Sequence, residues 1–168
     1  DEPVAGPDSL LVDVRAAGVC YPDLLLIGGQ YQLKVDPPFI PGTEVAGVVR
    51  SAPEGSGLAT GDRVFGPVML GGYAGQVSIP LASVMPTPPE LDDGQAVSLL
   101  VNYLTMFFAL QRRAALQPGE TVLVLGSAGG VGTAAIQVAK AMGAQYLALP
   151  YAGANSLNQA VRAVAGRS

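Results

Sequence analysis

The sequence predicts an α/β fold in two units, a small β-rich unit followed by part of a parallel sheet. Two observations carry this prediction. Up to about Pro89, short runs of strand-forming residues alternate with Pro and Gly, whereas the residues beyond it show helical periodicity and then a strand, a glycine-rich turn and a helix. Charge divides in a similar way, because all 13 acidic residues lie within residues 1–120. We place the boundary between residues 98 and 99.

Composition excludes several classes of protein. Of the 168 residues, 49% are apolar and only 13% are charged, whereas disorder needs low hydrophobicity and high charge. The net charge of −4 argues against a nucleic-acid partner. The chain has no histidine, which excludes histidine general bases and histidine-containing metal sites. Its single cysteine, Cys20, excludes an intramolecular disulfide and an all-cysteine zinc site.

Two stretches without charge, Gly94–Gln111 and Thr121–Ala139, are about as long as a membrane-spanning helix. The second contains four glycines within seven residues and the first begins with a helix-start pattern, so we expect buried helices and a strand instead of membrane spans. The N-terminal residues are acidic and lack the basic and apolar regions of a signal peptide. We therefore expect a cytoplasmic protein with no membrane association.

In the first unit, Leu11–Ala17 alternates in polarity and predicts a half-exposed strand with Val12, Val14 and Ala16 on one face. A short helix is predicted at Tyr21–Ile27, because a proline stands where the first turn would be and two glycines follow. Further strands are predicted at Glu44–Arg50, Arg63–Phe65 and Gly75–Ile79.

The second unit opens with Asp92 as a predicted N-cap and Gln95 as its reciprocal partner. The helix that follows should end at two arginines, since the helix dipole favours cations at that end. The continuous apolar run Thr121–Leu125 predicts a strand buried on both faces, and Thr133–Met142 predicts a helix. A last helix is predicted after Ser156.

Strand, glycine loop and helix is the arrangement that binds a pyrophosphate, because the first N–H groups of the helix are unpaired and the helix dipole is positive there. Against the pattern G-x-G-x-x-G, a serine replaces the first glycine and the other two glycines match. The alternative is a tight turn that binds no ligand. The cofactor-binding candidates are Ser127, Ala128, Gly129, Gly130, Val131 and Gly132.

No acidic residue occurs after Glu120. An acid about 20 residues beyond the glycine loop usually contacts the adenosine ribose of NAD, so its absence favours NADP(H). This inference depends on the chain beyond Gln145. Tyr146–Leu149 is either the second strand of the sheet or part of a stretch that comes later in such a dinucleotide-binding unit. In the latter case roughly 20 residues, including those that contact the ribose, are absent between Gln145 and Tyr146.

Several segments together carry a family resemblance. They are Ala16–Asp23 (AAGVCYPD), Pro38–Val49 (PFIPGTEVAGVV), Gly61–Val64 (GDRV), Tyr103–Thr105 (YLT) and Leu116–Ala144. With these segments, the chain resembles a medium-chain dehydrogenase/reductase of the zinc-free quinone oxidoreductase (zeta-crystallin-like) type. The resemblance implies a GroES-like catalytic domain over residues 1–98, without its N-terminal strands, and a partial Rossmann NADP-binding domain over residues 99–168. It also implies a chain about half as long as the family needs.

The resemblance implies NADPH-dependent transfer of hydride to quinones or other α,β-unsaturated carbonyls. An enoyl thioester reductase is the nearest alternative, and a non-catalytic dinucleotide-binding relative is an alternative of another class. The family also leads us to expect a homodimer. Zinc-dependent relatives have a histidine where Thr43 stands and a lobe of four cysteines, both of which this chain lacks. The resemblance therefore implies a zinc-free site.

By the same resemblance, Thr105 matches a threonine that approaches the nicotinamide. Cys20 stands where quinone reductases commonly have an asparagine, and Leu25 where some have a tyrosine. Tyr21 could donate its hydroxyl to the substrate carbonyl, so Tyr21 and Cys20 are the catalytic candidates, with plain packing as the alternative for both. The acidic residues at positions 23 and 44 are typical of the family and are expected to be structural.

Overall fold

The computed structural model describes residues 3–150, which form two compact units divided between Val101 and Asn102. This division lies inside a helical segment that runs from Asp93 to Arg113, a few residues beyond the boundary expected at 98/99. In the described part of the chain, no helix is both long and apolar enough to cross a membrane. The helix predicted after Ser156 lies outside the described residues.

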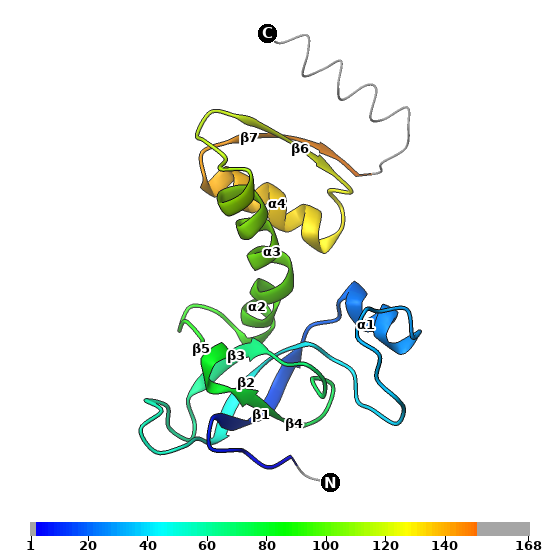
Figure 1. Cartoon of the computed structure of the whole chain (residues 1–168). Coiled ribbons are helices and arrows are strands. Elements are labelled where there is room, and N and C mark those ends of the chain that lie inside the picture. The colour runs from blue at the N-terminus through cyan, green and yellow to red at the C-terminus, as the bar shows by residue number, and fades with distance from the viewer. Residues whose placement is uncertain (1–2, 151–168) are drawn as a thin grey trace. The chain divides into compact units, whose positions relative to one another are not determined.

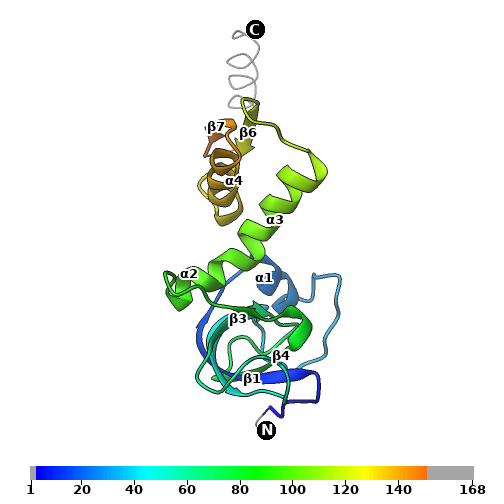
Figure 2. The same ribbon diagram turned by 90° about the vertical axis from the view of Figure 1, so that its left-hand side faces the viewer.

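The first unit contains one antiparallel sheet with the strand order β4-β1-β2-β3-β5 (Figure 1). The strands that the sequence predicts are all present, and the short strand β5 adds a further edge. The sheet is curved, as the second view shows (Figure 2). Its strands are Ser9–Ala17 (β1), Glu44–Ser51 (β2), Arg63–Pro67 (β3), Gln76–Pro80 (β4) and Met85–Pro86 (β5), with a 3-10 turn at Leu81–Ser83.

Two small apolar cores cover this sheet, and neighbouring residues of a strand belong to different cores. The second core joins Ala46 and Phe65 of the sheet to residues of the helical segment. Because the central strand β2 contributes to both cores, its residues from Glu44 to Val49 are buried almost without a break, whereas the last two residues of the strand are exposed. The first core consists of Leu10, Val12, Val45, Val49, Val64, Val68, Val77 and Ile79, and the second of Ala46, Phe65, Ala96, Val97 and Leu100.

The alternation predicted for β1 breaks near the end of the strand. The register of β1 against β2 shifts between Val14 and Ala16, which leaves Arg15 as an extra residue. Beyond it, Ala17 packs against the same core as Val14, whereas Ala16 packs against the other core. The prediction that Ala16 shares a face with Val12 and Val14 is therefore wrong, because one inserted residue reverses the alternation.

Two short helices begin as the sequence predicts. Helix α1 spans Tyr21–Ile27 and has Pro22 in its first turn, where the missing N–H costs no hydrogen bond. Helix α2 spans Asp93–Ser98 and begins with the reciprocal cap. The Gln95 N–H donates to Asp92 Oδ1 at 2.7 Å, and the Asp92 N–H donates to Gln95 Oε1 at 3.0 Å.

Beyond α2, the helical segment departs from the regular helix that the sequence predicts. Turns of π-helix span Leu99–Tyr103 and Phe108–Arg113, on either side of α3 (Leu104–Phe107). The buried carboxylate of Glu44 accepts a hydrogen bond from the Val101 N–H at 2.9 Å. A side chain that captures an N–H in this way interrupts the regular helical ladder, and no pattern in the sequence announces it.

In the second unit, β6 (Thr121–Leu125) and β7 (Gln145–Leu149) pair in parallel, and α4 (Gly130–Ala141) connects them. Helix α4 packs along one face of the strand pair, as both views show (Figures 1 and 2). The structure has Tyr146–Leu149 in a strand beside β6, as one of the two alternatives for this segment predicts. Helix α4 begins earlier than the predicted Thr133, because the last glycines of the loop already form its first turn.

Candidate functional site

The glycine loop follows β6 directly and makes a tight turn into α4. Gly126 has a φ of 67°, a backbone conformation that favours glycine. The Ser127 N–H donates to the carbonyl oxygen of Leu149 on β7 at 3.0 Å, and the Gly129 N–H donates to that of Gly126 at 3.1 Å. These two hydrogen bonds fix the loop between the sheet and the helix.

Gly132 allows α4 to pack closely against the end of β6. A Cβ atom on Gly132 would lie 2.3 Å from the carbonyl oxygen of Gly126 and 2.6 Å from the Cα of Ser127. Gly129 differs, because a Cβ atom there would approach nothing closer than 3.5 Å and the φ of −81° suits any residue. The fold therefore requires glycine at position 132 but not at position 129.

The first N–H groups of α4 are free to bind a ligand. The N-cap is Gly129, which has no side chain to cap them, and the helical ladder begins with the Thr133 N–H donating to the Gly129 carbonyl oxygen at 2.8 Å. Within residues 3–150, the N–H groups of Gly130, Val131 and Gly132 have no acceptor. With the positive end of the helix dipole, they form an arrangement that favours an anion.

Ser127 adds a largely buried polar residue to the same loop. The residue is only 9% exposed, and its hydroxyl has no hydrogen-bond partner in the part of the chain that the structure describes. The residues after it in the loop, Ala128, Gly129 and Gly130, are exposed. The loop thus presents its backbone outward and holds one polar side chain inside.

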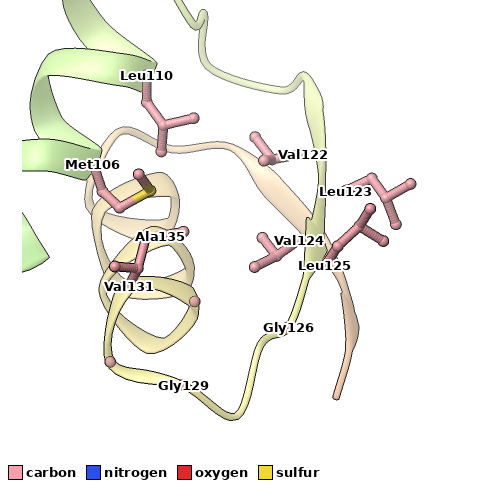
Figure 3. Close-up of a pocket in the computed structure, with 12 residues that line it drawn as sticks. Met106, Leu110, Val122, Leu123, Val124, Leu125, Gly126, Gly129, Val131 and Ala135 are labelled. Carbon is pink, nitrogen blue, oxygen red and sulfur yellow. The ribbon is translucent and has the colours of Figure 1, made fainter. Parts of the chain in front are cut away.

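An apolar pocket of about 480 Å³ adjoins the loop. Figure 3 shows Val122 and Val124 on the side of β6 that faces α4, with Met106 and Leu110 approaching from the helical segment. The loop glycines close one end of this pocket. The remaining lining residues are Leu123, Leu125, Gly126, Gly129, Gly130, Val131, Gly132 and Ala135.

Two neighbouring residues of the first π-helical turn contact α4. The side chain of Asn102 lies so close to Gly130 that a Cβ atom there would be 2.9 Å from Asn102 Nδ2 and 3.3 Å from Oδ1. The hydroxyl of Tyr103 donates to Gln137 Oε1 at 2.9 Å. An amide side chain is therefore held at the start of α4, beside the unpaired N–H groups.

In the first unit, Cys20 belongs to a buried polar network. Its thiol donates to Glu44 Oε1 at 2.9 Å, and its N–H donates to Asp23 Oδ2 at 2.8 Å. Asp23 Oδ2 also accepts a hydrogen bond from the Tyr73 hydroxyl at 3.0 Å. The carboxylates are 1% exposed at Asp23 and 2% at Glu44, and Glu44 also holds Val101 as described above. Such contacts agree with the structural role expected of both acids.

The network controls the ionisation of the thiol and of the phenol. Burial raises the pKa of Cys20 to about 12, with further increases from the hydrogen bond to Glu44 and from the charges of Glu44 and Asp23. The pKa of Tyr73 also rises to about 12, first through burial and then through its hydrogen bond to Asp23. The Cys20 thiol is therefore neutral near pH 7, whereas nucleophiles and metal ligands are thiolates.

The other predicted site residues are placed in different surroundings. The side chain of Tyr21 is 70% exposed on α1, and Thr105 is exposed on α3. Thr43 Oγ1 is buried, with no partner among residues 3–150. In that part of the chain there is also no group of three or more Cys, Asp and Glu side chains able to hold a metal ion. Independence of zinc stays a prediction.

Sequence reasoning missed two residues of these sites. Tyr73 comes from a loop far along the chain from Asp23, and nothing in the sequence pairs them. Asn102 stands three positions before Thr105, and residues three apart lie on the same side of a helix. This spacing from a predicted cofactor-binding residue was the available signal for Asn102.

Comparison with known proteins decides the family. The family model of the alcohol dehydrogenase GroES-like domain matches residues 6–89. The quinone oxidoreductase-like protein 2 homolog of Nematostella vectensis is 38% identical over 136 residues, which cover 80% of this chain and 37% of that protein. The chain belongs to the medium-chain dehydrogenase/reductase superfamily, quinone oxidoreductase type. The predicted family is confirmed.

Solved structures confirm the fold class of this quinone oxidoreductase-type chain. A probable oxidoreductase from Mycobacterium abscessus matches with a TM-score of 0.87 and 55% identity, over 96% of this chain and 52% of that one. The quinone oxidoreductase of Thermus thermophilus, also solved in complex with NADPH, matches with a TM-score of 0.79 and 37% identity, over 96% and 50%. The fold is a GroES-like domain followed by a partial Rossmann-like sheet, and the chain spans about half the length of these two proteins.

Proposed function

We propose that the protein is an NADPH-dependent oxidoreductase that transfers hydride to quinones or other α,β-unsaturated carbonyls without zinc. The observation that carries the proposal is the row of unpaired N–H groups at the start of α4. Similarity to the Thermus quinone oxidoreductase and its NADPH complex supports it. Homodimerisation and a cytoplasmic location stay predictions from the family resemblance and the sequence.

The loop fits the pyrophosphate of a dinucleotide. Gly129 is exposed, and neither its φ nor its neighbours require glycine. The absence of a side chain at position 129 therefore serves no purpose in the fold, but it leaves space for a ligand to approach the backbone. This is the role of the second glycine in the dinucleotide-binding pattern. The N–H groups of Gly130, Val131 and Gly132 would hold the phosphate oxygens.

A bound nicotinamide supplies the hydride, so the chain's own residues mainly position the reactants. We propose that Thr105 contacts the nicotinamide and that the exposed hydroxyl of Tyr21 donates a hydrogen bond to the substrate carbonyl. For Cys20 we propose a supporting role, because its thiol is neutral and already donates to Glu44. The Cys20–Glu44 hydrogen bond then holds the start of α1, where Tyr21 stands.

We propose NADPH in preference to NADH on two grounds. No acidic residue follows Glu120, so none there would repel a 2′-phosphate. The related Thermus protein has been solved in complex with NADPH. Titration of both nucleotides should give an affinity for NADPH at least about tenfold higher, and equal affinities would contradict the preference.

The test of the site is a titration of the folded chain with NADPH, followed by thermal shift and by nucleotide fluorescence. Saturable binding is expected for the wild type. Gly129→Ala adds a methyl group where the ligand should lie, without meeting the protein, and should weaken binding at least about tenfold. Gly75→Ala is the matched control, because a Cβ atom there has nothing within 4 Å. It should bind NADPH like the wild type.

Other outcomes would change the proposal. A folded chain that responds to neither nucleotide would remove the cofactor. Normal binding by Gly129→Ala would move the ligand away from the loop. In turnover assays, a preference for enoyl-CoA over quinones would make the protein an enoyl thioester reductase, and binding without turnover on either substrate class would make it a non-catalytic relative.

A further inference from the structure

We propose that Asn102 is a further binding residue for the dinucleotide, and that its side-chain amide donates a hydrogen bond to the pyrophosphate at the start of α4. The inference rests on the proposed function. It adds a residue that lies outside the glycine loop and belongs to the preceding helical segment.

The position of Asn102 follows from its contact with Gly130. The nearest atoms to a Cβ placed on Gly130 are Nδ2, Cγ and Oδ1 of Asn102, at 2.9, 3.2 and 3.3 Å. The whole amide therefore lies against the first residue of α4. Glycine at position 130 gives this amide its space, which is a different reason from the close packing that requires Gly132.

A second contact fixes the segment that carries Asn102. The hydroxyl of the adjacent Tyr103 donates to Gln137 Oε1 at 2.9 Å. Gln137 stands seven positions after Gly130, about 10 Å further along the helix axis. This hydrogen bond ties the residue after Asn102 to α4 and so helps to keep Asn102 near the start of the helix.

The groups gathered at the start of α4 are donors without partners. The Asn102 amide makes no hydrogen bond to any of residues 3–150, and neither do the N–H groups of Gly130, Val131 and Gly132. Ser127 beside them is a residue with only 9% exposure, and its hydroxyl is equally without a partner in this range. Donors of this kind need an acceptor with several oxygen atoms, and a diphosphate offers them with the charge that the helix dipole favours.

The position of Asn102 can be tested without any ligand. Gly130→Ala should cost the wild-type chain more stability than it costs the Asn102→Ala chain, because the Asn102 amide has to move away from the new methyl group. In an Asn102→Ala background the same change should be close to neutral, since the obstacle is gone. Urea unfolding of the four proteins gives this comparison. An equal cost of Gly130→Ala in both backgrounds would show that Asn102 does not lie there, whatever the ligand.

The binding role is tested with two probes that share a pyrophosphate, NADPH and 2′-phospho-ADP-ribose. Asn102→Ala should weaken both by about tenfold, the loss expected for one hydrogen bond to a charged group. Asn102→Asp keeps the shape but places a negative charge beside the phosphates, so it should weaken both by about a hundredfold or more. Gln111→Ala removes an exposed amide from the same helical segment and should bind like the wild type.

Each result separates this inference from the proposed function. If the wild type binds neither probe, the proposed function itself fails. If the wild type binds both and Asn102→Ala binds equally well, only the role of Asn102 fails. If Asn102→Ala weakens NADPH but not 2′-phospho-ADP-ribose, the amide contacts the nicotinamide half and the assignment to the pyrophosphate is wrong.

Discussion

The buried network of the first unit and the glycine loop of the second use polar groups in opposite ways. In the network, the thiol of Cys20 and the hydroxyl of Tyr73 both donate to carboxylates inside the same unit. In the loop, several N–H groups find no acceptor within residues 3–150. Buried polar groups with internal partners hold a fold together, whereas donors left free at a helix start are available to a ligand.

Glycines show the same contrast. A Cβ atom on Gly18 would lie 1.9 Å from Glu44 Oε1, so this glycine makes room for the network. Gly132 makes room for the close approach of α4 and β6, but Gly129 in the same loop makes room for nothing in the described chain. A glycine that the fold does not need is therefore the better guide to a ligand.

The largest effect is expected where the backbone itself blocks a side chain. Gly132→Ala places a methyl group 2.3 Å from the Gly126 carbonyl oxygen, and should lower the free energy of unfolding by about 3 kcal/mol. Gly129→Ala is the matched control and should cost no more than about 1 kcal/mol, since it changes only the N-cap. Urea unfolding measures both. Equal costs would contradict the different roles assigned to the two glycines.

A smaller loss is expected when the network loses its central carboxylate. Glu44→Ala leaves the Cys20 thiol and the Val101 N–H without an acceptor, and should cost about 2 kcal/mol of stability. Hydrogen exchange should show the Val101 amide losing protection. Glu44→Gln keeps one acceptor oxygen and should lose less. An unchanged Val101 exchange rate in Glu44→Ala would show that the carboxylate does not hold the π-helical turn.

The network also predicts how stability depends on alkaline pH. The pKa of Cys20 rises from 9.0 to about 12 and that of Tyr73 from 10.0 to about 12, so the folded state favours both protonated forms. The stabilisation is complete below pH 9 and is lost as the pH rises towards 12, by at most about 1.4 kcal/mol per pH unit for Cys20 and by less for Tyr73, because solvent screens a side chain that is 39% exposed. Urea unfolding between about pH 7 and pH 11 measures the decline.

The matching control for this pH dependence is the double variant Cys20→Ala with Tyr73→Phe, in which neither group can ionise. Its stability should change less across the same range. A wild-type stability that stays constant over that whole range would mean that the two groups titrate normally in the folded protein.

The smallest effect on stability is expected at the exposed catalytic candidate. Tyr21→Phe removes a hydroxyl from a side chain that is 70% exposed, and should change the free energy of unfolding by less than about 0.5 kcal/mol. If the hydroxyl donates to the substrate carbonyl, kcat for quinone reduction should fall while NADPH affinity stays unchanged. Unaltered kcat would leave Tyr21 as a packing or surface residue.

Local patterns were sufficient for most of the secondary structure. The helix at Tyr21–Ile27, the cap at Asp92 and the strand at Thr121–Leu125 lie where the sequence predicts them, because each depends on nearby residues. The face of Ala16 and the π-helical turn around Val101 were not predictable. Both depend on a neighbour that is distant in the chain, the strand β2 in one case and the Glu44 carboxylate in the other.

The sequence by itself determined the family and the glycine loop between a strand and a helix, since strand, glycines and helix start follow one another within a few residues and their backbone geometry is local. Only the tertiary structure decided that Gly132 packs against β6 while Gly129 does not, and that Asn102 lies at the start of α4. It also decided that Cys20 is a neutral donor to Glu44. The physical reason is that packing contacts, burial and the ionisation that follows from them depend on which distant residues meet.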